Sequence, residues 1–225
     1  MLQAASARTV RPVIDAVRLP ASALVLLTIG VCLGWFTWLD QWIIDHFTGS
    51  VSTRHDATPM FTGGILLPFN GTTPNWERPF ATWTWGGSIV VSVLVVIWVA
   101  RSLRRAGRPL EASLWLTVWV IGNAIEVAGK HELTRPLLYG TVDGVRSLVG
   151  PFTSSYPSGH AMRSFFVAAA ITAVRPHWRR WLFAWFALVP VFLVLIGAHT
   201  ITDVIGGTLL AMVCCRTIVV VARGR

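Results

Sequence analysis

Six stretches with almost no charge constrain the fold of this chain more than any other feature of its sequence. They are residues 19–39, 79–100, 112–129, 161–174, 181–198 and 204–222, and their only charged residues are Glu126, Arg163 and Arg216. A helix needs about 20 apolar residues to cross the hydrocarbon core of a bilayer. The sequence therefore predicts an all-α fold: a polytopic membrane protein built as a six-transmembrane-helix bundle.

The composition agrees with lipid as the main solvent and argues against nucleic acid as a partner. Hydrophobic residues make up 54% of the chain and charged residues only 13%, whereas about a quarter of a soluble domain is charged. The net charge is +9, but the basic residues stand in short blocks between apolar runs and not on one polar face. Such blocks are typical of topology signals beside membrane spans.

The arginines predict the orientation of the bundle. Thirteen basic residues flank one set of span ends and five flank the other, and the richer side is normally cytoplasmic. We therefore expect a single membrane-embedded domain over 1–225 in the cell (inner) membrane, with both termini, including 1–18, in the cytoplasm. Residues 38–80 are expected outside: 38–47 as an interfacial segment, and 57–76 as a loop because proline and glycine interrupt it.

Three polar segments abut the predicted outer ends of the spans. They are residues 130–136 (KHELTRP), 157–160 (PSGH) and 199–203 (HTITD). His199 and Asp203 are four residues apart, so in a helix they share one face, and the carboxylate can orient the imidazole. The PSGH segment opens a predicted span, where free backbone N–H groups bind anions and Gly159 permits close approach.

The same segments contain further groups suited to a phosphate. Ser158 offers a hydroxyl, His160 a titratable proton, and Lys130, the only lysine of the chain, an ammonium. Arg135 adds a guanidinium, and both cations are natural phosphate partners. One histidine can attack phosphorus while the other protonates the leaving oxygen, so this set can transfer a phosphoryl group with no metal and no cofactor.

These motifs resemble those of the type 2 phosphatidic acid phosphatase (PAP2) superfamily, whose members contain K-x6-RP, PSGH and SR-x5-H-x3-D in this order. The resemblance covers about residues 115–215, and it implies a catalytic core over about 111–222. It also implies a nucleophilic His199 oriented by Asp203, with His160 as general acid. The implied phosphate-binding groups are Lys130, Arg135, Ser158 and the Gly159 amide.

Two positions depart from the family pattern. Arg135 follows Lys130 too early, so that Leu137 stands at the arginine position of the first motif, and Phe192 and Leu193 stand at the serine and arginine of the third. Arg163 lies three residues after His160, on the same helix face, and a charge inside a span is costly. We expect Arg163 to complete the phosphate site, although a structural or snorkelling arginine is the alternative. Glu126 is expected to pair with Lys130, in a structural or a catalytic role.

The resemblance implies a membrane lipid phosphatase acting at the extracytoplasmic face on a lipid phosphate or pyrophosphate, through a phosphohistidine. Candidate substrates are phosphatidic acid, phosphatidylglycerol phosphate and polyprenyl phosphates. Two alternatives stay open. Lipid head-group transferases of the sphingomyelin-synthase type share the His-His-Asp set and lack the third-motif arginine. A non-catalytic membrane protein with the same fold is the other. The expected partners are the lipid substrate and the bilayer, and the sequence indicates no protein partner.

Overall fold

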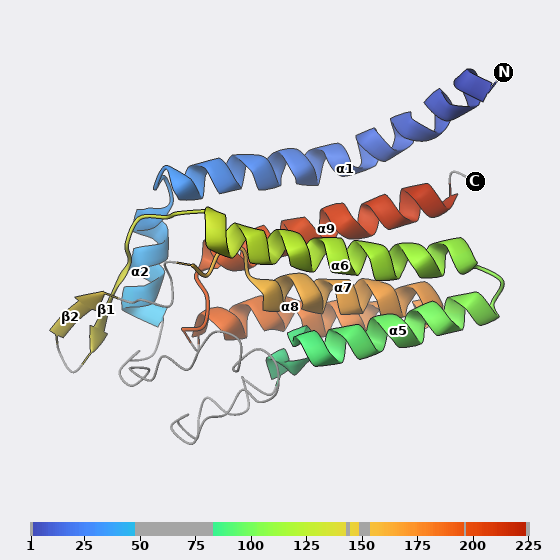
Figure 1. Cartoon of the computed structure of the whole chain (residues 1–225). Coiled ribbons are helices and arrows are strands. Elements are labelled where there is room, and N and C mark those ends of the chain that lie inside the picture. The colour runs from blue at the N-terminus through green and yellow to red at the C-terminus, as the bar shows by residue number, and fades with distance from the viewer. Residues whose placement is uncertain (1, 48–82, 143–144, 149–153, 196, 224–225) are drawn as a thin grey trace.

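The computed structural model describes residues 2–47, 83–142, 145–148, 154–195 and 197–223. Its long helices lie side by side as a bundle, with a short helix and a hairpin at one end (Figure 1). In chain order the elements are α1 (Leu2–Cys32), α2 (Thr37–Phe47), the 3₁₀ helix η1 (Thr84–Gly87), α5 (Ile89–Arg105), α6 (Pro109–Glu132), β1 (Tyr139–Val142), β2 (Val145–Leu148), α7 (Gly159–Val174), η3 (Pro176–Trp178), α8 (Arg179–Leu195) and α9 (Ile201–Arg223). Each predicted charge-poor stretch overlaps one long helix.

Local sequence signals explain where the α5–α6 hairpin begins and turns. Ser88 caps α5, because its side-chain oxygen accepts a hydrogen bond from the Val91 N–H at 3.2 Å. Gly107 adopts a positive φ of 73° between the two helices, a conformation that glycine reaches at little cost. Pro109 then opens α6, where a missing N–H costs nothing. These local signals place the turn between Arg105 and Pro109.

The first predicted span does not continue straight to residue 39. The structure ends α1 at Cys32, and α2 leaves it at an angle of 80°. Gly34 lies in the turn with a φ of 75°, and a Cβ there would approach the Pro136 ring to 2.8 Å. The predicted span was therefore too long. Residues 33–39 carry no charge, but a turn set by backbone conformation and packing interrupts the helix there.

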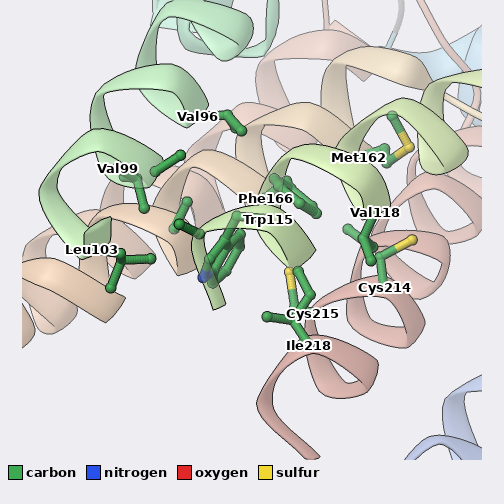
Figure 2. Close-up of a cluster of buried hydrophobic side chains, with 14 of the residues drawn as sticks. Val96, Val99, Leu103, Trp115, Val118, Met162, Phe166, Cys214, Cys215 and Ile218 are labelled. Atoms are coloured by element: carbon green, nitrogen blue, oxygen red, sulfur yellow. The ribbon is translucent and has the colours of Figure 1, made fainter. Parts of the chain in front are cut away.

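The bundle core lies between α5, α6, α7 and α9 (Figure 2). Trp115 of α6 meets Phe166 of α7 edge to face, with ring centroids 5.1 Å apart. Small side chains occupy many of the surrounding buried positions, among them Ala100, Ala112, Ala168, Ala170 and Ala211. In a membrane, close approach of helix backbones through small residues is a main source of packing energy. Helix α1 packs along α9, and α8 packs against α7.

Helix length and composition identify fewer membrane spans than the sequence predicted. Among the described residues, three helices are long and apolar enough to cross a bilayer: α6, η3 with α8, and α9. The bent pair α1–α2 raises the number to four if it forms one broken span. Helix α7 has 16 residues and α5 has 17, which is below the usual length of about 20. The described part of the chain is thus a largely helical protein with several apolar, membrane-compatible helices.

A two-stranded hairpin is the exception to the all-α prediction. Strands β1 and β2 pair antiparallel, with Tyr139 opposite Leu148, in a region that contains no recognisable sequence motif. The hairpin and α2 lie at one end of the bundle, whereas the start of α1 and the end of α9 lie at the other (Figure 1).

Candidate active site

The three polar segments meet at the end of the bundle that holds α2. The Ser158 N–H, just before α7, donates to the Asp203 carbonyl of α9 at 2.9 Å. Gly207 lies directly against the Ser158 carbonyl, so close that any Cβ at this position would overlap it. At the end of α6, a Cβ on Gly129 would come within 2.8 Å of the Pro157 ring. Glycines on two helices thus allow the PSGH turn to sit between α6 and α9.

The PSGH turn forms a capped helix N-terminus. The Ser158 side chain is fully buried, and its oxygen accepts from the Ala161 N–H at 3.3 Å. The hydroxyl hydrogen is not used by this bond. The first N–H groups of a helix have no partner within the helix, so those of Gly159 and His160 can donate to an anion.

The two histidines lie beside each other. The imidazole rings of His160 and His199 have centroids 6.5 Å apart and are tilted by 53°. Gly159, next to His160, adjoins the Glu126 carboxylate that pairs with Lys130 and Arg163. The structure therefore brings the two imidazoles and two of the predicted cations to the same end of the bundle, near the N-terminus of α7.

Asp203 is held by a set of donors at the start of α9. Its carboxylate is fully buried and accepts from the Ser155 hydroxyl at 2.6 Å and from the Thr200 N–H at 2.9 Å. His199 Nδ1 faces Asp203 Oδ2 at 3.5 Å, longer than a hydrogen bond, and this buried nitrogen has no other partner among the described residues. Catalytic hydrogen bonds are often this long without substrate. Because Nδ1 faces the carboxylate, Nε2 is the nitrogen left to attack a substrate.

The Glu126 carboxylate forms ion pairs with two of the predicted cations. Its buried carboxylate pairs with Lys130 one turn later in α6 and with Arg163 Nη1 of α7 at 3.4 Å. Arg163 also donates through Nε to the Gly87 carbonyl at 2.7 Å and through Nη1 to Asn123 at 3.0 Å. A Cβ on Gly159 would lie 2.7 Å from Arg163 Nη2, so the guanidinium adjoins the N-terminus of α7.

Arg135, the third predicted phosphate ligand with a positive charge, has different partners from Lys130 and Arg163. Its guanidinium is only 4% exposed, and it donates to Asp203 Oδ1 at 2.8 Å and to Asp40 Oδ2 at 2.6 Å. Arg135 thus bridges Asp40 and Asp203, the carboxylate that faces His199. The physical reason is that α6 ends at Glu132, so Arg135 lies past the helix face that carries Lys130.

Several residues of this cluster were not identified from the sequence. Ser155, Thr200 and Thr202 are common polar residues, and no pattern marks them. Asp40 had one signal, since it is an acidic residue within the aromatic and apolar run 38–44 (WLDQWII), but that run gave no reason to place it near Asp203.

A partly buried histidine pair beside a capped, cation-lined helix terminus defines a class of site suited to transferring an anionic group. Residues 132–225 match the family model of the PAP2 superfamily, which confirms the resemblance that the motifs indicated. Lys130, Glu126 and Asp40 lie before the matched segment.

Two solved structures are similar to the chain. The crystal structure of the first transmembrane PAP2 type phosphatidylglycerolphosphate phosphatase from Bacillus subtilis matches with a TM-score of 0.61 and 15% identity, over 90% of this chain and 94% of that one. The crystal structure of Aquifex aeolicus LpxE matches with a TM-score of 0.49 and 18% identity, over 67% of this chain and 88% of that one. A comparison with curated proteins finds no match. The likeness to the Bacillus protein shows the fold.

Proposed function

We propose that this protein is a membrane lipid phosphatase that forms a phosphohistidine on His199. The observation that carries the proposal is the pair of imidazoles, 6.5 Å apart, at a helix N-terminus flanked by Lys130 and Arg163. Two imidazoles supply a nucleophile and an acid, while the cations and N–H groups stabilise the charge of a phosphoryl group in transfer.

The reaction then takes two steps. In the first, His199 Nε2 attacks phosphorus, the bond from phosphorus to the lipid oxygen breaks, and His160 gives that oxygen a proton. In the second, a water oxygen attacks phosphorus, His160 takes the water proton, and the P–N bond breaks to release inorganic phosphate. Asp203 faces Nδ1 in both steps and stabilises the positive charge on the ring.

We assign Arg163 the charge that the family places in the third motif. At the matching positions this chain has Phe192, whose ring packs on Trp83 at 6.1 Å, and Leu193, which is buried. Neither side chain can bind phosphate. Arg163 Nη2 adjoins Gly159 at the N-terminus of α7, where it can pair with a phosphate held by the Gly159 and Ser158 donors.

The substrate class follows from the membrane setting. We infer six spans, termini in the cytoplasm, and a site at the outer face of the cell membrane, formed by the last four helices of one domain over 1–225. An amphiphile can then reach the site sideways with its chains in lipid. Lipid phosphates are the class proposed: phosphatidic acid, phosphatidylglycerol phosphate and polyprenyl (pyro)phosphates. The name of the Bacillus relative includes phosphatidylglycerolphosphate.

Transfer to an alcohol is a second candidate, and the apolar third motif favours it. Leu193 is buried against Ala161 and Val189, so the third-motif position carries no charge, as in the head-group transferases that lack this arginine. In this case the phosphoryl group would pass from His199 to a hydroxyl of a second lipid in place of water.

The test is phosphate release by the purified full-length protein from a panel of lipid phosphates in detergent, with a metal chelator present. We expect release from at least one lipid and a loss of about 10³-fold or more in His199→Ala, because the nucleophile is gone. His160→Ala should lose about 10²-fold or more, since general acid catalysis contributes this much.

His177→Ala is the matched control, because His177 is an exposed histidine in η3. It should keep wild-type activity. Lipid products that carry the phosphate on a new alcohol would favour the transferase. No turnover and no acid-labile ³²P-labelled enzyme with any lipid would leave the non-catalytic alternative.

A further inference from the structure

Asp40 lies outside the segment that matches the family and yet reaches the candidate active site. It is in the short helix α2, where the neighbouring side chains Trp38 and Trp42 are exposed, whereas Asp40 is 1% exposed. Its carboxylate points into the bundle toward the start of α9. A fully buried carboxylate is costly unless its charge is paired, so its partners indicate what it does.

Asp40 shares one partner, Arg135, with the His199–Asp203 pair. Asp40 Oδ2 accepts from Arg135 Nη2 and from the Thr202 hydroxyl, each at 2.6 Å, and Oδ1 accepts from the Thr202 N–H at 3.2 Å. Arg135 Nη1 in turn donates to Asp203 Oδ1 at 2.8 Å. One guanidinium therefore bridges the carboxylate of α2 and the carboxylate that faces His199.

The charges of this cluster explain why two carboxylates are needed. Arg135 carries one positive charge and contacts two negative groups, so the bridge retains one net negative charge beside the imidazole. Without Asp40, Arg135 would be balanced by Asp203 alone, and the carboxylate would attract a positively charged His199 less strongly. The Arg135 guanidinium would also lose one of its two carboxylate partners, which help to fix its orientation toward Asp203.

We propose that Asp40 is a positioning residue of the His199–Asp203 pair: it binds Arg135 and Thr202 so that Asp203 keeps its place and its negative charge toward the nucleophile. This inference rests on the proposed phosphatase function. It implies that α2, a helix outside the matched family segment, takes part in turnover by holding Arg135.

A purely structural role for Asp40, as an anchor of α2, makes a different prediction. An anchor would affect thermal stability or substrate entry, and so the melting temperature or KM. A positioning residue acts on the charge that His199 develops in the transition state, so kcat falls while KM is kept.

The experiment compares Asp40→Asn with Asp45→Asn in the full-length protein, on the lipid phosphate from which the wild type releases most phosphate. Asn keeps the size of Asp40 and removes the charge. We expect kcat to fall by about tenfold or more with KM within about twofold. Asp45 is on the same helix, exposed, and bonded to Gln41, so Asp45→Asn should keep both constants.

A double variant separates positioning from an independent effect. Because Asp40 is proposed to act through Asp203, Asp40→Asn should reduce kcat in the wild type but hardly further in an Asp203→Asn background. Equal losses in both backgrounds would overturn the proposal, as would an unchanged kcat in Asp40→Asn alone. Restored kcat in Asp40→Glu, which returns the charge, would support it.

Thr202→Val covers the case in which Asp40→Asn does not fold. This change removes the hydroxyl that fixes Asp40 and leaves the ion pairs and the volume in place. A lower kcat with KM within about twofold is expected, and an unchanged kcat overturns the proposal. If the wild type itself releases no phosphate, the proposed function fails and this inference fails with it. If the wild type is active and Asp40→Asn leaves kcat unchanged, only this inference fails.

Discussion

Glu126 shows how single residues set up the proposed anion site. Its carboxylate is buried between Lys130 and Arg163, two cations that could not be held inside the bundle without a counter-ion. Lys130 remains 21% exposed while Arg163 is 4% exposed, so the lysine is the more accessible of the two cations. A phosphate that enters would meet both cations already oriented.

Arg163 is the residue whose replacement best tests this arrangement. We expect Arg163→Gln to lower kcat/KM by about 10- to 150-fold, because a hydrogen bond to a charged group contributes about 1.5–3 kcal/mol. Arg163→Lys should recover part of the loss, since it returns the charge without the planar fork. Initial rates on the same lipid phosphate measure both.

Arg108→Gln provides the comparison for Arg163→Gln. Arg108 also pairs with a glutamate, Glu111, but its side chain is 48% exposed, and it lies between α5 and α6. Such a surface pair is worth little, so activity should be unchanged. Full activity of Arg163→Gln with an unchanged KM would show that Arg163 serves packing only.

At the scale of elements, the contact between α7 and α9 holds the two histidines in one place. The Ser158 carbonyl, at the start of α7, lies directly on Gly207 of α9, and the Ser158 N–H binds the Asp203 carbonyl. The spacing between Asp203 and Gly207 is one helical turn, so both contacts fall on the same face of α9.

Gly207→Ala should therefore move α7 away from α9. The added methyl group overlaps backbone and not a flexible side chain, so the helices must separate, at a cost of about 1–3 kcal/mol in stability. We expect a lower melting temperature and a loss of at least about tenfold in kcat, measured by thermal unfolding and phosphate release.

Gly122→Ala tests whether any larger residue at a helix contact has this effect. A Cβ on Gly122 would lie 3.4 Å from Cys214 Sγ and 3.5 Å from Met162 Sδ, which is ordinary van der Waals contact. This variant should be stable and active. Equal damage from both changes would argue against a special role for the Ser158–Gly207 contact.

At the scale of the whole molecule, the two ends of the bundle differ in chemistry. One end holds the first residues of α1 and the last of α9, and the other holds α2 and the hairpin (Figure 1), next to the site. The exposed tryptophans Trp35 and Trp38 lie at this second end, 59% and 70% exposed, as is typical of residues at a membrane interface.

A labelling experiment tests the proposed orientation. In a variant without Cys32, Cys214 and Cys215, a membrane-impermeant maleimide added to intact cells should label His46→Cys of α2 and not His177→Cys of η3. Both residues are exposed, and the positive-inside rule places them on opposite sides.

Opened cells are the control for this labelling. After lysis both cysteines should react equally. Labelling of His177→Cys in intact cells would reverse the orientation, and labelling of both would show that the two residues lie on the same side.

The sequence alone determined the helices and the motif residues, because charge depletion and short motifs are local properties. Hydropathy predicted six long helices, and the PSGH and H-x3-D motifs identified the two histidines and Asp203. Hydropathy did not detect the turn at Gly34, since a positive φ leaves no mark on hydropathy, nor the hairpin in a region without a recognisable motif.

Only the tertiary structure decided how the charges pair. Arg135 and Lys130 are both basic residues of the same short segment. In the structure, Arg135 binds Asp40 and Asp203, whereas Lys130 binds Glu126. Pairing depends on which helix faces meet, and Asp40 is 95 residues from Arg135, so no local pattern records it. In a medium of low dielectric constant each buried charge must find a partner, and the fold determines which partner is within reach.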